Sequence, residues 1–262
     1  MLLSEKSFAH RVFRDIENID WSRACTPRGS YALAGILVPW FAAAALLFFA
    51  LGLYLGFFVA PADARQGEAY RIIFLHVPAA WMSMLIYLML AVCAGVGLMS
   101  NARLPAMMAH ALAPTGALFA FLALWTGCLW AKPIWGTWWV WDTRQFSQLI
   151  LLFLYIGFIA LQAAIDDPAL ADKAGALLSM AGIVTIPINV LSAQWGTSPD
   201  QGGSVSLTGT PGMALSMLTG MLAVAVGFWL YSCAVALLRL RCVILERERH
   251  SDWVATRGRA AS

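Results

Sequence analysis

One short segment concentrates residue types that are well suited to holding a flat ligand. The segment "KPIWGTWWVWDTRQ", from Lys132 to Gln145, carries four tryptophans, an aspartate and two cations. Indole rings provide wide, flat and rigid apolar area, and their N–H groups can donate hydrogen bonds at the ring edge. Lys132 and Arg144 flank the rings and could pair with carboxylates, with bidentate geometry from the guanidinium. Together these residues predict a site for a planar aromatic ligand that carries acidic groups.

The spacing of the four tryptophans predicts how the segment presents them. Trp135, Trp138 and Trp141 follow one another at intervals of three residues, so in a helical turn they would share one face. Trp139 would turn partly away from that face. A planar macrocycle with two acidic side chains, which is heme, would satisfy both the rings and the flanking cations.

Heme also needs an axial ligand for its iron, most often a histidine. Of the four histidines, His10 and His250 lie in the terminal tails, and His110 lies near the far end of its apolar segment. Only His76, in "YRIIFLHVPAAWMS", lies on the same side of the membrane as the tryptophan segment. Pro78 follows, and proline is tolerated in the first turn of a helix, so His76 should lie about one turn into its helix. The alternative for a lone histidine is a hydrogen bond to a carbonyl or to water.

Three more residues are candidates with open roles. Asp142 could orient a neighbouring indole N–H or Arg144, or it could cap the helix that follows, where its charge would favour the helix dipole. Trp195, in a later loop, extends the predicted aromatic surface. Asp200, in the same loop, could be a weak oxygen ligand or a solvated turn residue.

The composition predicts an all-α integral membrane protein around these residues. The chain has 262 residues, of which 61% are hydrophobic and 12% charged, with a mean hydropathy of +0.73. Six stretches without a charged residue each reach the roughly 20 residues that a helix needs to cross about 30 Å of hydrocarbon. We therefore expect a single membrane domain over 1–262, with tails at 1–30 and 240–262 and a six-helix bundle over 31–239. The predicted spans are about 32–59, 73–99, 107–130, 147–165, 175–193 and 212–238.

The distribution of Lys and Arg predicts the orientation of these spans. With both termini inside, thirteen Lys and Arg lie on the inner side and four on the outer side, which is the bias expected of cytoplasmic segments. This N-in, C-in topology places three loops outside: Pro61–Arg71, Lys132–Arg144 and Gln194–Pro211. The net charge of +3 comes from the inner tails, so a nucleic-acid partner is not expected.

An aromatic belt is the alternative interpretation of the tryptophans, because indoles favour the headgroup region. Six of the twelve tryptophans lie between Trp125 and Trp141, whereas the inner side has only Trp21 and Trp253, both in the tails. A belt would be shared between the two interfaces. The one-sided clustering therefore favours a binding surface.

Other classes of function have weaker support in the sequence. The five cysteines form no CxxC or CxxCH, which argues against a thiol redox site and a covalent c-type heme site. The outer loops hold no nucleophile and base pair, so we expect no enzyme. A transporter that itself moves heme or another anion across the bilayer would need polar residues inside the spans, and we expect essentially none beyond Asn189, Thr and Ser. Pro114 and Pro187 should kink their helices, and the GxxxG of Gly52 and Gly56 is a spacing that is common by chance.

Several segments together resemble one known family. The segment "WGTWWVWD" is similar to the tryptophan-rich signature of the heme-handling membrane proteins of cytochrome c maturation. The stretches "APAD" at Ala60–Asp63, "YRIIFLHVPAAWMS" at Tyr70–Ser83 and "AKPIWGTWWVWDTR" at Ala131–Arg144 resemble, more closely, the heme exporter protein C family of the system I pathway. The resemblance covers all six predicted spans.

The resemblance implies a role in heme delivery. It implies a subunit that binds non-covalent heme b transiently at the periplasmic face of the bacterial inner membrane and presents it to a periplasmic heme chaperone. The implied partners are that chaperone, an ABC-type ATPase with its membrane subunits, and a small single-span membrane subunit. The residues that match the family's motif are His76 as the iron ligand and the tryptophan segment as the surface for the macrocycle.

One position departs from the family's pattern. The resemblance implies a second axial histidine in the third outer loop, after a tryptophan and before Gln-Gly. In this chain Trp195 and the Gln201-Gly202 pair keep the register, and Asp200 stands in the histidine's place. We therefore expect heme to be held by His76 alone, with an open, aqueous or carboxylate sixth position, which makes it more labile or high-spin.

Overall fold

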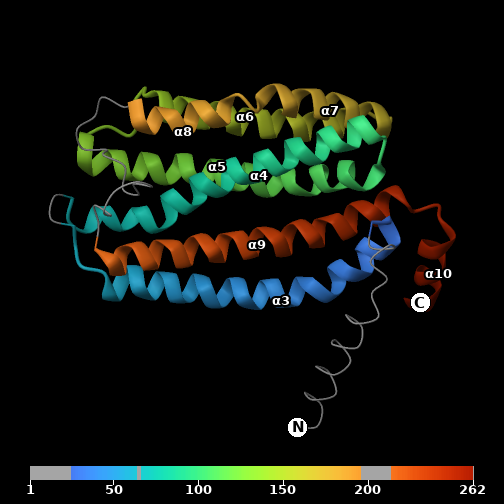
Figure 1. Ribbon diagram of the computed structural model, residues 1–262, viewed down its shortest axis with the longest axis horizontal. Helices are drawn as coiled ribbons and strands as arrows, with labels where there is room; N and C mark the ends of the chain where they lie inside the picture. The colour runs from blue at the N-terminus through green and yellow to red at the C-terminus, as the bar shows by residue number, and fades with distance from the viewer. Residues whose placement is uncertain (1–24, 64–65, 196–213, 262) are drawn as a thin grey trace, which may run out of the picture.

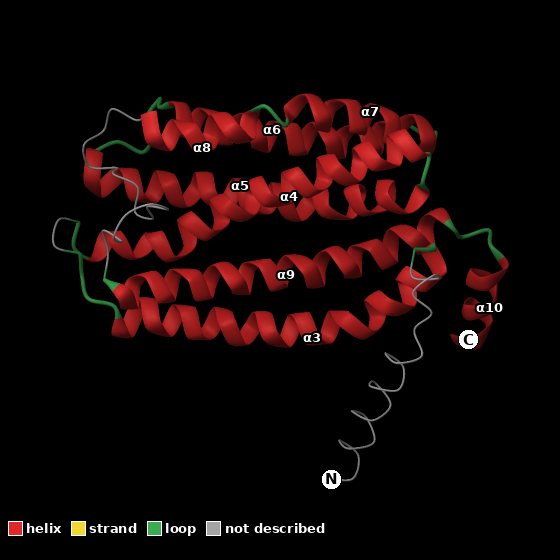
Figure 2. Ribbon diagram, in the orientation of Figure 1, coloured by secondary structure: helices red, strands yellow, loops and turns green. Residues whose placement is uncertain are grey.

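The computed structural model describes residues 25–63, 66–195 and 214–261, with side chains described up to 191 in the second stretch and up to 256 in the third. These residues form an all-α structure (Figures 1 and 2). Its elements are α3 (Pro27–Tyr54), the π-helical turn η1 (Leu55–Val59), the 3-10 helix η2 (Glu68–Ile72), α4 (Ile73–Ser100), α5 (Arg103–Trp135), α6 (Thr143–Ala164), α7 (Pro168–Gly182), α8 (Thr185–Trp195), α9 (Leu215–Arg247) and α10 (Asp252–Ala261).

The described residues contain six helical stretches that are long and apolar enough to cross a membrane, as the sequence predicted. They are Pro27–Val59, Glu68–Ser100, Arg103–Trp135, Thr143–Ala164, Pro168–Leu191 and Leu215–Arg247. The last of them extends beyond the predicted boundary at 238. The all-α membrane architecture is therefore confirmed.

The helix ends that border the candidate residues lie at one end of the bundle, on the left in Figure 1. η1, α5 and α8 end there, and η2, α6 and α9 begin there. We call this end, where α5 ends at Trp135 and α6 begins at Thr143, the tryptophan end. The end where α3 begins and α9 finishes is the opposite end.

The helices pack in an order that places α4 and α5 at the centre. α3 and α9 lie side by side along one flank, and α6, α7 and α8 lie along the other (Figure 1). α4 and α5 contact each other and both contact α9, while α4 also packs against α7 and α5 against α6. The central helices α4 and α5 carry His76 and the start of the tryptophan segment. The site is therefore built on two helices that are packed by neighbours on both flanks.

The α3–α9 seam is made of small residues that let two backbones approach closely. A Cβ added at Gly52 would lie 2.9 Å from the Gly220 carbonyl oxygen and 2.7 Å from the Val224 nitrogen. A Cβ added at Gly220 would lie 3.1 Å from the Gly56 nitrogen. Helices in lipid associate through such close contacts because burial of apolar surface gives them little advantage. The GxxxG of Gly52 and Gly56, which sequence alone could not separate from chance, lies in this interface.

The fifth span is interrupted, as the proline in it predicted. α7 ends at Gly182 and α8 begins at Thr185, and Pro187 lies just inside α8. Because Pro187 has no N–H, it cannot bond the carbonyl of Ile183 four residues earlier, and Ile186 donates to that carbonyl instead at 3.0 Å. α5, in contrast, runs continuously through Pro114.

A buried hydrogen-bonded network inside the bundle joins three helices. The Gln148 side chain of α6 donates to Ser83 Oγ of α4 at 2.8 Å and accepts from Asn189 Nδ2 of α8 at 3.1 Å. Tyr155 Oη, about two turns further along α6, donates to the Ser83 carbonyl at 2.7 Å. The expectation that the spans hold essentially no polar residue beyond Asn189, Thr and Ser was wrong, because it overlooked Gln148.

Replacing Gln148 by leucine is expected to destabilise the bundle by about 1–3 kcal/mol, because two interhelical hydrogen bonds disappear and the Ser83 and Asn189 side chains lose a partner. Thermal unfolding in detergent checks this as a lower Tm. Ser232→Ala is the matched control, since the buried Ser232 hydroxyl bonds only the Phe228 carbonyl of its own helix, at 2.7 Å. Equal Tm values for the two variants would contradict the role of the network.

The opposite end is held by an ion pair that joins three helices. The Arg247 guanidinium of α9 donates to both carboxylate oxygens of Asp172 on α7, at 2.6 and 2.8 Å, and to Gln162 Oε1 of α6 at 3.3 Å. The Gln148 network inside the bundle and the Arg247 contacts at the opposite end therefore both join helices that frame the tryptophan end.

Candidate functional site

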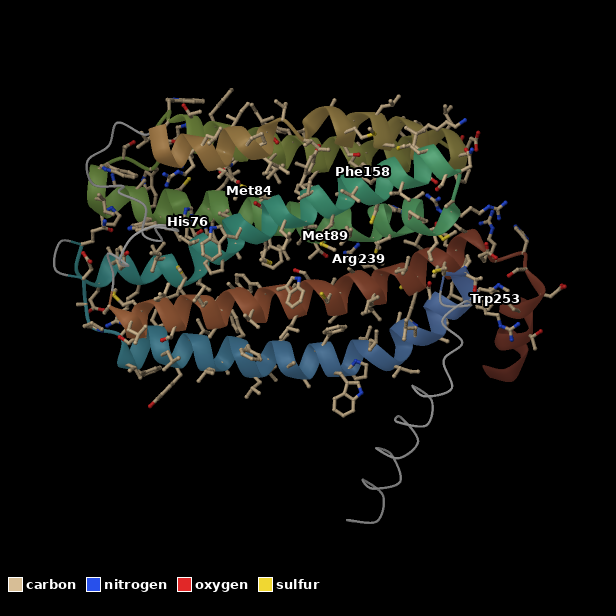
Figure 3. All side chains as sticks on the ribbon, viewed as in Figure 1. His76, Met84, Met89, Phe158, Arg239 and Trp253 are labelled. Carbon is tan, nitrogen blue, oxygen red and sulfur yellow. The ribbon has the colours of Figure 1, made fainter. Side chains whose placement is uncertain are left out.

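His76 lies at the tryptophan end, on the first turn of α4 (Figure 3). Its Nδ1 lies 3.0 Å from the Ala123 carbonyl oxygen and 3.1 Å from Thr126 Oγ1, both on α5. No hydrogen-bond partner for its Nε2 occurs among the described residues. One side of the imidazole is therefore fixed to the neighbouring helix, and the other nitrogen is available.

Gly127 makes the room that the His76 ring occupies. A Cβ added at Gly127 would lie 3.2 Å from His76 Cε1 and 3.9 Å from Gln145 Nε2. These distances show that the imidazole and the beginning of α6 both border the same small residue of α5. The iron-ligand candidate and the segment that follows the tryptophans are therefore close neighbours.

The Trp130 ring packs against His76 and is itself packed by Tyr70. The Trp130 ring meets the imidazole edge-on, with centroids 5.6 Å apart, and meets Tyr70 edge-on at 5.9 Å. Trp130 Nε1 donates to Gln66 Oε1 at 2.8 Å, which ties the connection between η1 and η2 to α5. Sequence reasoning counted Trp130 among the clustered tryptophans but did not place it, Tyr70 or Gln66 in the site. The position of Trp130 at the end of its span, one turn and a half before Trp135, was the feature of the sequence that could have placed it in the site.

The entry into α4 differs from the sequence expectation. α4 begins at Ile73 and continues directly from the 3-10 helix η2, so Pro78 lies in the second turn and not in the first. His76 is the fourth residue of α4, in agreement with its expected depth of about one turn. The 3-10 helix adds a turn before Ile73 because Arg71 anchors it, donating to the carbonyls of Gly56 and Ala60 at the end of the first span.

The tryptophan segment is not a helical turn, and the prediction that Trp135, Trp138 and Trp141 share a helical face was wrong. α5 ends at Trp135, and Gly136 adopts the left-handed conformation with φ +73° that stops a helix. Residues 136–142 have no regular structure. The Thr137 hydroxyl donates to the Trp139 carbonyl at 3.1 Å, a local bond that competes with helix formation.

The four tryptophans are presented to different degrees. Trp141 is 77% exposed, Trp138 55% and Trp135 39%, whereas Trp139 is half-buried. The rings of Trp139 and Trp141 meet edge-on, with centroids 5.5 Å apart. The Trp139 Nε1 donor is buried and has no hydrogen-bond partner among the described residues. The extended segment therefore presents its rings as an open surface that contains one unsatisfied indole donor.

The two cations that flank the segment are engaged differently. Lys132 Nζ donates to the Gly136 carbonyl at 2.9 Å and lies 5.7 Å from the centroid of the Trp138 ring. Arg144 Nε is buried and lacks a partner among the described residues, and its guanidinium lies within electrostatic range of His76. Arg144 is therefore the better placed of the two cations to receive an acidic group beside the imidazole.

Asp142 serves as the cap of α6. Its carboxylate accepts from the Gln145 backbone N–H at 2.6 Å, which is the N-cap contact that the sequence left as one alternative. The Gln145 side chain then turns back, accepts from the Val140 N–H at 3.3 Å and lies against Cys128 of α5. This pair sets the angle at which the tryptophan segment enters α6.

Two residues expected in the site fall outside this description. Trp195 is the last residue of α8, and its side chain is not among the described ones. Asp200 lies between the described stretches. Their roles remain as the sequence predicted them.

The arrangement fits heme. A planar macrocycle needs an available imidazole nitrogen for iron, flat apolar surface, and donors for its carboxylates. His76, the open indole surface and the unsatisfied donors of Trp139 and Arg144 supply these three requirements at one end of the bundle. Buried donors without partners are uncommon in folded proteins, so Trp139 Nε1 and Arg144 Nε are candidates to bond the carboxylates of a ligand.

Comparison with known proteins gives a single result. The family model for heme exporter protein C matches residues 20–255. Heme exporter protein C of Escherichia coli strain K12 is 43% identical over 230 residues, which cover 87% of this chain and 92% of that protein. The proteins of the same name from Haemophilus influenzae and Paracoccus denitrificans are 38% and 36% identical over 228 residues, with 87% of this chain covered and 93% and 94% of theirs. The resemblance carried by the tryptophan segment and the His76 region is confirmed, and the chain belongs to the heme exporter protein C family.

Proposed function

We propose that this chain binds heme at the tryptophan end and delivers it for the maturation of c-type cytochromes. The observation that carries the proposal is the His76 imidazole, held to α5 by Nδ1 and packed edge-on by Trp130, at the end of the bundle that carries the tryptophan segment. Membership of a family whose members are named for heme export supports it.

The individual residues take different parts in holding heme. His76 binds the iron, and Trp135, Trp138, Trp139 and Trp141 hold the macrocycle, with Trp195 extending their surface. Arg144 pairs with one propionate, and the Trp139 N–H donates a second hydrogen bond to the same propionate. Lys132 holds the Gly136 carbonyl in this structure and contributes positive charge at the rim. Asp142 acts through the backbone of Gln145, so it is a positioning residue.

The membrane topology of the proposal follows the distribution of positive charge. The tryptophan end faces the periplasm, and the tails at 1–30 and 240–262 face the cytoplasm of a bacterium. A periplasmic heme chaperone then has access to the tryptophan surface. An ABC-type ATPase with its membrane subunits and a small single-span subunit complete the complex.

Release of heme depends on the sixth position of the iron. With Asp200 in place of a second histidine, that position is open to water, to a carboxylate or to a partner. An incoming ligand from the chaperone can take it without first displacing an imidazole, which lowers the barrier to transfer. The chain supplies binding and presentation, and the covalent attachment of heme uses groups of other proteins.

A transporter that moves heme across the bilayer through this chain remains less favoured. Among the buried polar side chains that the structure describes, Gln148, Ser83 and Asn189 bond one another within the packed interior. Others, such as Thr126 and Ser232, bond carbonyls of their own helices. A pathway for an anionic macrocycle would need polar groups that face an open passage. The network therefore supports a structural role.

The tryptophan surface is tested by heme titration of the purified full-length chain in detergent. Trp139→Leu is expected to weaken heme binding about 3- to 10-fold, because an aromatic contact of this kind contributes about 0.5–1.5 kcal/mol. Trp40→Leu is the control for loss of a tryptophan elsewhere, since Trp40 lies on α3, outside the tryptophan segment. Equal weakening by both variants, or no saturable heme binding by the unaltered chain, would overturn the proposal.

A further inference from the structure

The Thr126 hydroxyl hydrogen is already committed within α5. Thr126 Oγ1 donates to the Leu122 carbonyl oxygen at 2.7 Å, and it also lies 3.2 Å from the Ala123 carbonyl oxygen. Thr126 is buried, with 4% of its surface exposed. Because a hydroxyl has one hydrogen and two lone pairs, Thr126 can only accept in its contact with His76.

His76 Nδ1 therefore faces two acceptors. The Ala123 carbonyl oxygen at 3.0 Å has no hydrogen to give, and Thr126 Oγ1 at 3.1 Å has already used its own. A lone pair on Nδ1 would be repelled by both oxygens. The ring can be accommodated only if Nδ1 carries the proton and donates to them. In the neutral imidazole the proton on Nδ1 leaves Nε2 with its lone pair.

The surroundings also fix the direction of the ring. A flip of the imidazole would place a carbon against the Ala123 carbonyl and Thr126 Oγ1, which would lose a strong donor. Trp130 packs against the ring edge-on, and Gly127 lies so close that an added Cβ would be 3.2 Å from His76 Cε1. Nε2 has no hydrogen-bond partner among the described residues, so its lone pair stays free.

From these contacts we infer that Thr126 is a positioning residue for the iron ligand, which together with the Ala123 carbonyl holds His76 as the Nδ1–H tautomer and keeps Nε2 ready to bind heme iron. This inference deepens the proposed heme site and rests on it. Hydrogen bonds from the distal N–H of a metal-binding histidine orient the ring and raise its basicity as a ligand. Thr126 therefore sets both the geometry and the strength of the iron–imidazole bond.

The tautomer is tested first in the heme-free protein. Full-length chain labelled with ¹⁵N at histidine is studied by NMR in lipid or detergent, and the His76 signals are assigned by their loss in His76→Ala. The expected spectrum shows a protonated Nδ1 and an unprotonated Nε2 for His76. A protonated Nε2 would overturn the inference. Because no heme is present, this result stands apart from whether the chain binds heme.

The positioning role is tested with two variants of Thr126. Thr126→Val keeps the shape of the side chain and removes the hydroxyl that accepts from His76. It is expected to lower heme affinity about 10-fold. This is the lower end of the range for loss of such a hydrogen bond, because the Ala123 carbonyl still accepts from Nδ1. It should also make the reduction potential of the bound heme more positive, since a less basic imidazole stabilises ferric iron less. Thr126→Ser keeps the hydroxyl and should restore both values.

The control for loss of a threonine hydroxyl elsewhere is Thr219→Val. Thr219 is exposed on α9, and its hydroxyl bonds the Leu215 and Ser216 carbonyls without facing a histidine. It should leave heme affinity and potential unchanged. A Thr126→Val protein with the affinity and potential of the unaltered chain would overturn the positioning role, and absence of heme binding by the unaltered chain would instead overturn the proposed function.

Discussion

Replacing His76 by alanine is expected to abolish stable heme binding, with affinity lowered more than about 100-fold. Loss of a hydrogen-bond partner of a metal ligand commonly costs 10- to 100-fold in metal affinity, so loss of the ligand itself should cost more. In the described residues His76 is the one histidine at the tryptophan end, and no other imidazole there can replace it. Heme content of the purified full-length protein, measured by absorption against protein concentration, checks the expectation.

The control for this variant is His250→Ala. His250 is exposed after α9 at the opposite end, where it accepts from the Arg249 guanidinium at 3.0 Å. It should keep the heme content of the unaltered chain. Equal heme content in the His76→Ala and unaltered proteins would remove His76 from the site and with it the assignment of the tryptophan end.

The second large effect concerns the position that departs from the family's pattern. Asp200→His is expected to convert ferric heme from high-spin to low-spin, because a second imidazole in the third outer loop would complete the iron's coordination. The variant should also lose heme more slowly to a competing apoprotein. Absorption and electron paramagnetic resonance spectra of the unaltered and variant proteins measure the change of spin state.

Asp200→Asn separates the imidazole from the loss of charge. It removes the carboxylate without supplying a strong iron ligand, so heme should stay high-spin. A low-spin spectrum with two histidine ligands in the unaltered protein would contradict the account, since the tryptophan end would then hold a ligand that the sequence does not supply there.

The helices of this fold could be predicted well because lipid constrains sequence strongly. Six uncharged stretches predicted six spans, and Pro187 predicted the break between α7 and α8. The partners of each helix could not be predicted. The GxxxG of Gly52 and Gly56 became meaningful only opposite Gly220, which lies far away in the sequence. Gln148 was missed because a single amide in an apolar stretch gives no sign of the Ser83 side chain that it bonds.

The candidate site shows the same division. The residue types of the tryptophan segment and the depth of His76 followed from local sequence. The shape of the segment did not, because Gly136 and Thr137 end α5 where a spacing of three residues predicted a further turn. The contacts of His76 with Ala123 and Thr126 join residues about 50 positions apart, which no local pattern records.

The central claim is that heme iron is bound at the tryptophan end by one imidazole of this chain. Electron–nuclear double resonance on the heme-loaded, full-length protein, labelled with ¹⁵N only at histidine, measures the coordinated nitrogens directly. The account predicts one strongly coupled histidine nitrogen in the unaltered protein, retained in His250→Ala and absent from His76→Ala. Coupling that persists in His76→Ala, or no coupled histidine nitrogen in the unaltered protein, would contradict it.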